Sequence, residues 1–223
     1  LQLIHAHGIK NVRVLDRTFN YNPRRAKELL RLFLEFHPDI RFHLEIHPAL
    51  LSEELKEELS LLPKGLLHLE AGIQSLREPV LEKSRRMGKL SDALDGLRFL
   101  CALPNMETHA DLIAGLPLYH LHEIFEDVRT LAEYAAGEIQ LESLKLLPGT
   151  EMRRRAEESG IKYSPLPPYE VLQTHEINVS ELQTARQLSR LLDGFYNTPA
   201  WQALTRELIL NCLLYTSPSP RDM

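Results

Sequence analysis

Histidine and carboxylate side chains alternate, two residues apart, along three apolar segments of the sequence. They are His43, Glu45 and His47 in the first segment, His68 and Glu70 in the second, and His109 and Asp111 in the third. On a β-strand this spacing places side chains on one face. Imidazole and carboxylate groups bind Zn²⁺ and other divalent ions. The chain has ten histidines, so chance also produces such pairs, and we assign no metal ligands from the pattern.

Two short strings combine an apolar run with a glycine and polar side chains. In residues 111–117, an acid is followed by Gly115, where a ligand can approach the backbone closely. In residues 70–75, Gln74 carries an amide that both donates to and accepts from a polar ligand. The alternative is purely structural: Asp111 caps a turn, and Ser75 is a helix N-cap.

Further polar groups follow other apolar runs. Arg85 and Arg86 can clamp a carboxylate or a phosphate, although a solvated helix face is their ordinary place. Thr18 and Asn20 can hydrogen-bond a cofactor or belong to a loop. Lys145 is either a ligand for a carboxylate or a surface lysine that extends into solvent.

Five apolar or alternating runs, each followed by a helical pattern, must position these groups. The runs are residues 12–16, 40–46, 66–73, 107–113 and 138–146. The helical patterns begin at Pro23 behind the N-cap Asn22 and near Ser52, and cover 79–86, 90–101, 122–136 and 151–159. This alternation predicts an α/β fold of parallel βαβ units, in which polar residues at the carboxyl ends of the strands share one edge.

The alternation of apolar runs and helical patterns ends at residue 162. Pro165, Pro167 and Pro168 interrupt the pattern, and helical stretches follow from 169–173 onward, at 181–196 and at 199–213. We therefore divide the chain into an α/β domain of residues 1–162 and a helical domain of 163–213. Residues 214–223 resemble translated adapter sequence, and we expect them to be a non-native tail.

The composition excludes several classes of protein. The 223 residues carry a formal charge of −5, which gives no reason to expect a nucleic-acid or membrane surface. No apolar run reaches the roughly 18 residues that span a bilayer. The two cysteines, Cys101 and Cys212, form no metal or redox motif, and we expect a reducing cytoplasm.

Taken together, several short sequence segments resemble those of the radical S-adenosylmethionine (SAM) superfamily. The resemblance is to cobalamin-binding-type members with an uncharacterised C-terminal helical domain. It rests on an ordered set of strings at residues 16–20, 70–75, 111–117, 144–150, 167–169 and 196–198. It implies a partial (β/α)₆ TIM-like barrel in which this chain holds the second to sixth strands, within residues 1–162.

The resemblance also implies roles for five residues in binding SAM. Glu45 meets the amino group, Arg86 the carboxylate and Asp111 the ribose, while Gln74 lines the pocket and Gly115 lies beside the cofactor. The charges agree in sign, because an acid faces an ammonium group and an arginine faces a carboxylate. The resemblance assigns no catalytic residue.

The sequence departs from the family at its defining motif. The C-x₃-C-x₂-C loop that holds a 4Fe–4S cluster is missing, and so is a cobalamin domain. We expect an inactive, N-terminally truncated fragment. The full enzyme would take electrons from a donor, cleave SAM to a 5′-deoxyadenosyl radical and act on an unknown, small-molecule or other substrate.

Two other interpretations stay open at this point. A metal-dependent hydrolase on a (β/α) barrel would use His43, Glu45, His47, His109 and Asp111. A non-catalytic interaction module would use the helical end of the chain as its binding surface.

Overall fold

The structure is a computed structural model that describes residues 1–86 and 88–212. The expected non-native tail, residues 214–223, lies outside the described residues, as does residue 213 of the last predicted helix. The chain forms two compact units. Of the described residues, unit 1 holds 1–73, 88–110 and 135–137, and unit 2 holds 74–86, 111–134 and 138–212. The predicted boundary after residue 162 stays a prediction.

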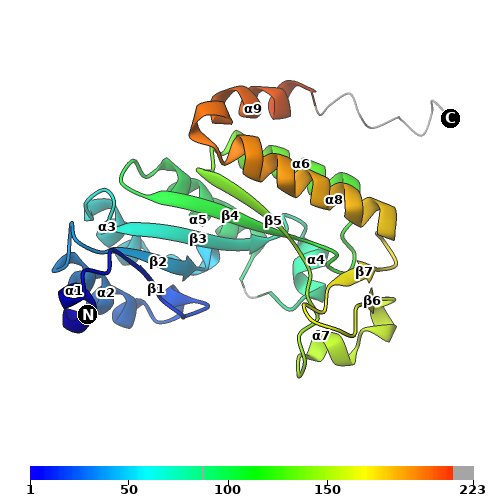
Figure 1. Cartoon of the computed structure of the whole chain (residues 1–223), viewed down its shortest axis with the longest axis horizontal. Helices are drawn as coiled ribbons and strands as arrows, with labels where there is room; N and C mark the ends of the chain where they lie inside the picture. Colours follow the sequence, from blue (N-terminus) through cyan, green and yellow to red (C-terminus); the bar gives the residue numbers. More distant parts are fainter. Residues whose placement is uncertain (87, 213–223) are drawn as a thin grey trace. The chain divides into compact units, whose positions relative to one another are not determined.

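Five parallel strands form the main sheet, and their order in space follows their order in the sequence (Figure 1). They are β1 (Asn11–Arg13), β2 (Arg41–Ile46), β3 (Leu67–Gln74), β4 (Glu107–Ala114) and β5 (Glu138–Ser143). Each follows a helical connection, as parallel pairing requires. This is the predicted α/β fold with a partial TIM-like barrel.

Helices connect the strands and make up most of the C-terminal region. The α-helices are α1 (Gln2–Ala6), α2 (Pro23–Leu34), α3 (Glu53–Leu61), α4 (Glu78–Lys83), α5 (Leu90–Ala102), α6 (Leu121–Glu133), α7 (Glu151–Arg154), α8 (Val179–Leu191) and α9 (Pro199–Cys212). Short 3₁₀ helices are η1 (Phe19–Tyr21), η2 (Pro48–Leu50) and η3 (Glu157–Ser159), and η4 (Leu192–Tyr196) is a π-helix that continues α8. None of the helices in the described ranges is long and apolar enough to cross a bilayer.

The predicted helix starts depend on side-chain caps. The Asn22 side chain accepts a hydrogen bond from the Arg25 amide at 3.1 Å, and Pro23 occupies the first turn of α2. The Ser52 hydroxyl accepts from the Leu55 amide at 3.3 Å at the start of α3. Local side-chain chemistry therefore sets both starts.

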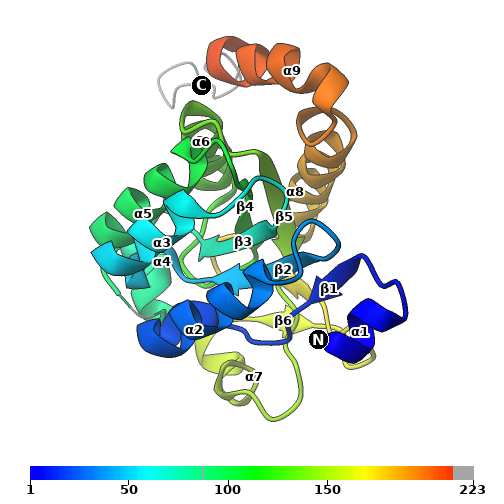
Figure 2. The same ribbon diagram turned by 90° about the vertical axis from the view of Figure 1, so that its left-hand side faces the viewer.

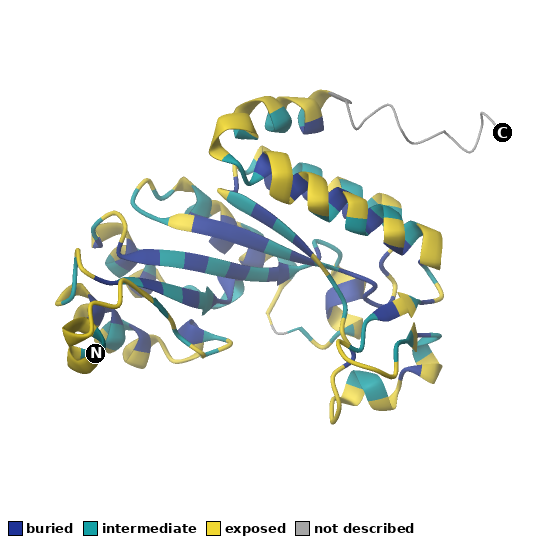
Figure 3. Cartoon of the chain, in the orientation of Figure 1, coloured by how far each residue is buried: buried dark blue, intermediate teal, exposed yellow. Residues whose placement is uncertain are grey.

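The two faces of β2 and β3 differ in character (Figure 3). Alternate residues such as Phe42 and Leu69 are buried, and the ring of Phe42 stacks on Phe33 of α2 with centroids 4.0 Å apart. Figure 2 shows α2, α3 and α5 on one side of these strands. The opposite face carries half-buried polar residues, which are candidates for function.

The prediction of a helix beginning at 169–173 is wrong. The segment forms β7 (Val171–Gln173), which pairs antiparallel with β6 (Lys162–Tyr163). Tyr169 has φ 62°, in the left-handed region that helices avoid. Its carbonyl accepts from the Leu146 amide at 2.9 Å, and the Val171 amide donates to the Leu144 carbonyl at 2.8 Å. The backbone thus pairs with the chain that follows β5.

The other helices of the C-terminal region form largely as predicted. In unit 2, the Asn197 side chain accepts from the Ile139 amide at 2.9 Å and donates to the Ile139 carbonyl at 3.0 Å, as a neighbouring strand would. The Arg206 guanidinium of α9 donates to the Ala132 carbonyl at 2.8 Å, near the end of α6. These bonds hold the segment after α8 against β5 and α6.

Candidate functional site

Three imidazoles lie side by side on the polar face of unit 1. His43 on β2 and His68 on β3 are register partners, and their rings stack with centroids 4.6 Å apart. His109 on β4 lies edge-on to His68 at 5.0 Å and to His43 at 5.5 Å. The alternation seen in the sequence therefore brings together one histidine from each of three strands.

Hydrogen bonds orient these rings. The Arg41 guanidinium donates to Nδ1 of His68 at 2.8 Å, so Nε2 of His68 carries the hydrogen and donates to Nδ1 of His109 at 2.8 Å. Nε2 of His43 lies 2.8 Å from Oε2 of Glu70, and Nε2 of His109 lies 3.7 Å from the same oxygen. The Glu70 carboxylate therefore accepts a hydrogen bond from His43 and lies within ion-pair distance of His109.

Burial and charge determine the protonation of the cluster. Burial, with added repulsion from His109 and His43, lowers the pKa of His68 to about 4. Hydrogen bonding from His109 lowers the pKa of Glu70 to about 2, although burial opposes the shift. At neutral pH a neutral His68 therefore lies close to an ionised Glu70.

His47 does not join this cluster, so the predicted face of His43, Glu45 and His47 is wrong at its last member. Strand β2 ends at Ile46, and His47 is buried, with Nδ1 accepting from the Ala49 amide at 3.3 Å. Because the strand periodicity stops there, His47 caps η2 instead. The set His43, Glu45 and His47 therefore supplies no single metal site.

Glu45 and Asn20 have different surroundings. Glu45 lies on the polar face, with Oε1 3.8 Å from Arg13, which also bonds Glu70. Asn20 is buried, and its amide donates to the His47 carbonyl at 2.9 Å and accepts from the His47 amide at 2.8 Å. Both the donor and the acceptor of the Asn20 side chain are therefore used in structural hydrogen bonds.

Four of the five predicted cofactor residues belong to unit 2, namely Gln74, Arg86, Asp111 and Gly115. Gln74 ends β3 with φ 70°, and Arg85, next to Arg86, has φ 55°. Both are strained for residues with a side chain, and such strain gathers at functional sites. Burial lowers the pKa of Arg86, and the charge of Asp111 on β4 opposes that shift. Arg86 and Asp111 thus act on each other electrostatically.

A buried carboxylate holds the turn that contains Gln74. Asp127 of α6 accepts from the Leu76 amide at 2.7 Å, from the Tyr119 hydroxyl at 2.6 Å and from Nε of Arg77 at 2.9 Å. Ser75 donates to it at 3.3 Å. Ser75 is therefore a turn residue and not the N-cap of α4, where Arg77 stands. Asp127 was not among the residues predicted from the sequence, where its only signal was an acid on the apolar face of an amphipathic helix.

Other predicted residues have ordinary structural explanations. Gly115 has φ +91°, and an added Cβ would contact Val171 and Leu144 at 3.4 and 3.6 Å. Its role beside a cofactor stays a prediction. Lys145 is exposed, with Nζ 3.4 Å from Glu142, in agreement with a surface lysine.

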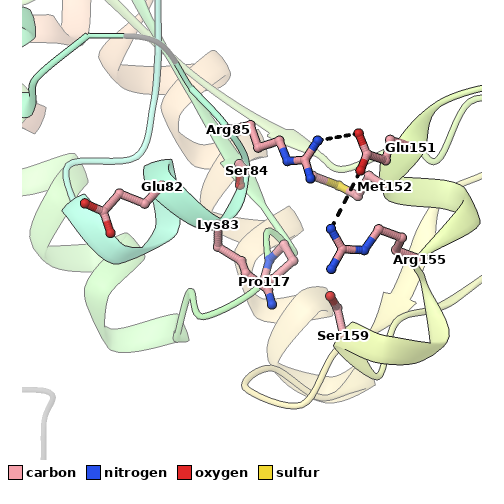
Figure 4. A pocket seen from close by; sticks show the side chains of 9 residues that line it. All are labelled: Glu82, Lys83, Ser84, Arg85, Pro117, Glu151, Met152, Arg155 and Ser159. Atoms are coloured by element: carbon pink, nitrogen blue, oxygen red, sulfur yellow. Dashed lines mark hydrogen bonds and ion pairs between the residues drawn. The ribbon is translucent and has the colours of Figure 1, made fainter.

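A pocket of about 290 Å³ opens in unit 2 beside Arg85 (Figure 4). The Arg85 guanidinium pairs with Glu151 at 2.5 Å, and Arg155 lies 3.6 Å from the same carboxylate. The remaining lining residues are Glu82, Lys83, Ser84, Pro117, Met152 and Ser159. Charge in this pocket is therefore largely compensated by ion pairs.

The residues of this chain do not fit a cluster held by three thiolates. The sequence has two cysteines, and Cys101 lies on α5. Burial raises the pKa of the Cys101 thiol to about 11, which keeps it protonated at neutral pH. Cluster ligands are thiolates, so no step of the chemistry can be assigned to a cluster on this chain.

Comparison with known proteins identifies similar structures. A family model described as a protein of unknown function, DUF4080, matches residues 157–214. No curated protein matches the sequence significantly. A radical SAM methyltransferase, TsrM from Kitasatospora setae, solved with cobalamin and a [4Fe-4S] cluster bound, matches with a TM-score of 0.60 and 19% identity over 84% of this chain. HemN from Escherichia coli, a coproporphyrinogen III oxidase and radical SAM enzyme, matches with a TM-score of 0.54 and 16% identity over 77% of this chain.

The chain has the fold of radical SAM enzymes. The archaeal Elp3 of Methanocaldococcus infernus also matches, with a TM-score of 0.51 and 12% identity over 70% of this chain. The present chain spans 39% of the TsrM chain, 37% of HemN and 43% of Elp3. The fold expected from the sequence strings is thus confirmed.

Proposed function

We propose that this chain is the SAM-binding part of a radical SAM enzyme. The observation that carries the proposal is the grouping of Gln74, Arg86 and Asp111 in one compact unit, with electrostatic interaction between Arg86 and Asp111. The radical SAM fold supports it, because residues at the carboxyl ends of the strands of such folds form the active site.

Each of these side chains has a role that matches its chemistry. Arg86 binds the carboxylate of SAM, because a guanidinium forms charge-assisted, often bidentate, hydrogen bonds with a carboxylate. Asp111 accepts hydrogen bonds from the ribose hydroxyls, and Gln74 lines the pocket at the end of β3. Gly115 lies beside the cofactor. Glu45 belongs to unit 1, and its role in binding the amino group of SAM rests on the resemblance alone.

The proposed reaction belongs to a larger protein than the present chain. A 4Fe–4S cluster, which the cysteines of this chain do not fit, would supply the electron for reductive cleavage of SAM in such a protein. This chain contributes SAM binding and is inactive alone, because its cysteines do not fit the cluster. The complete enzyme works in the cytoplasm with an electron donor, a substrate that is still unknown and, by likeness to TsrM, cobalamin.

Titration of the purified chain with SAM, followed by amide chemical shifts, tests the proposal. Without a cluster to hold the methionine end, we expect weak binding with shifts at Gln74, Arg86 and Asp111. Arg86→Gln should weaken binding about tenfold or more, since it removes a charge-assisted bond.

Arg85→Gln is the matched control. Arg85 is the adjacent residue and pairs with the exposed Glu151, so its loss should leave SAM binding nearly unchanged. No shifts with SAM in the folded chain, or equal losses in the two variants, would overturn the assignment.

A further inference from the structure

We propose that His43, His68 and His109 form a binding site for one divalent transition-metal ion of the Zn²⁺ type. One ring nitrogen from each residue lies within 4.8 Å of those from the other two. The proposal goes beyond the proposed function and is independent of it, because none of these imidazoles belongs to the SAM-binding set.

The scaffold of the site consists of paired strands. Each histidine is on a strand, the three strands are neighbours in the sheet, and His43 and His68 are exact register partners. The side chains are 26%, 15% and 3% exposed, in the order His43, His68 and His109. Ligands on strands are held more precisely than ligands on loops, so small side-chain rotations can close the three nitrogens around an ion.

The ligand type selects the ion. Imidazole nitrogen suits Zn²⁺ and its transition-metal neighbours, whereas Ca²⁺ and Mg²⁺ require oxygen ligands. The Glu70 carboxylate accepts a hydrogen bond from His43 at 2.8 Å. A carboxylate behind a metal-bound imidazole orients the ring and adds negative charge to the site.

Arg41 and Glu107 determine how His68 becomes a ligand. In the metal-free protein, Arg41 occupies Nδ1 of His68, and the hydrogen on Nε2 bridges to His109. Coordination through Nε2 requires that hydrogen to move to Nδ1. The Glu107 carboxylate lies 3.7 Å from Nδ1 and already pairs with Arg41. It can therefore accept a hydrogen bond from the new Nδ1–H group when Arg41 turns aside.

This arrangement predicts opposite effects for two neighbours of the same ring. Removing Arg41 abolishes a competitor for Nδ1 and a nearby positive charge, so Arg41→Ala should tighten metal binding about tenfold. Removing the acceptor charge in Glu107→Gln should weaken binding about tenfold or more. A network that merely fills space would show neither change.

The test uses the full chain after treatment with EDTA. Zn²⁺ is titrated by calorimetry, and Co²⁺ is titrated by visible absorption, which reports the geometry of its ligands. We expect one ion per chain and intense tetrahedral Co²⁺ bands. His43→Gln should abolish stoichiometric binding, because glutamine keeps a donor for Glu70 without being a good ligand. Circular dichroism checks that each variant is folded.

His122→Gln is the control. It removes one ring of the stacked pair His120 and His122, at the start of α6, where the centroids are 5.5 Å apart. This variant should bind as the unchanged chain does. The proposal is overturned if the folded chain binds no stoichiometric metal, if His122→Gln loses binding, or if Arg41→Ala fails to strengthen it. The Arg41 and Glu107 variants keep the test decisive if His43→Gln does not fold.

Discussion

The two polar regions of the molecule are positioned by different means. In unit 1, the register of neighbouring strands places His43 directly beside His68, and the side chains bond mainly to one another. In unit 2, a buried carboxylate outside the sheet, Asp127, holds a strained turn that carries Gln74. Polar groups aligned by strand pairing follow from the sheet itself, whereas the second region depends on a single charged side chain.

The largest effect should come from Asp127→Ala. The change leaves Arg77 without its buried partner and the Tyr119 hydroxyl and Leu76 amide without an acceptor. Breaking a buried ion pair costs about 3–5 kcal/mol, and urea unfolding measures it. The exposed Asp95, paired with Arg98, is the control, and Asp95→Ala should cost at most about 1 kcal/mol. Equal costs for the two variants would show that Asp127 does not organise unit 2.

Acid should weaken the chain through His68. The pKa of His68 is about 4 in the folded chain, below the 6.5 of a solvent-exposed histidine, so the unfolded chain binds the proton first. Stability should therefore fall as the pH drops from about 6.5 to about 4, by roughly 3 kcal/mol. Urea unfolding at several pH values with EDTA measures this loss.

The Glu70 contribution occupies a different pH window. Its pKa falls from 4.5 to about 2 on folding, so its stabilisation is present above pH 4.5 and is lost as the pH falls toward 2. His68→Asn should flatten the profile between pH 6.5 and 4 without removing the loss below pH 4.5. If the dependence of stability on pH is unchanged in His68→Asn, the assignment of an uncharged His68 in the folded chain is wrong.

Tyr119→Phe should have a smaller effect than Asp127→Ala. It removes one hydrogen bond of 2.6 Å to a charged group and leaves the other donors of Asp127 in place. Such a bond contributes about 1.5–3 kcal/mol. In a double-mutant cycle with Asp127→Asn, the two changes should be non-additive, and additivity would show that they belong to separate networks.

The smallest effect should come from Lys145→Ala. Lys145 is 45% exposed and pairs with Glu142 at 3.4 Å, so the change should cost about 0–1 kcal/mol. SAM titration of the variant should match that of the unchanged chain. A loss of SAM binding comparable to that in Arg86→Gln would place Lys145 in the cofactor site.

Strands and caps were predictable because their signals are local. The alternation of polar and apolar residues in 40–46 and 66–73 predicted β2 and β3, and Asn22 and Ser52 predicted the starts of α2 and α3. The segment at 169–173 was mispredicted because its conformation depends on pairing with residues 144–146, which no local pattern reports.

By itself, the sequence determined the α/β fold, the five strands and the residues that line the polar face, since side-chain alternation and capping act over a few residues. Only the tertiary structure decided that His68 lies beside His43 and that His47 leaves this face, because strand register and the end of β2 govern both placements. It also decided that Asp127 is buried among four donors, because residues on other segments supply every one of them.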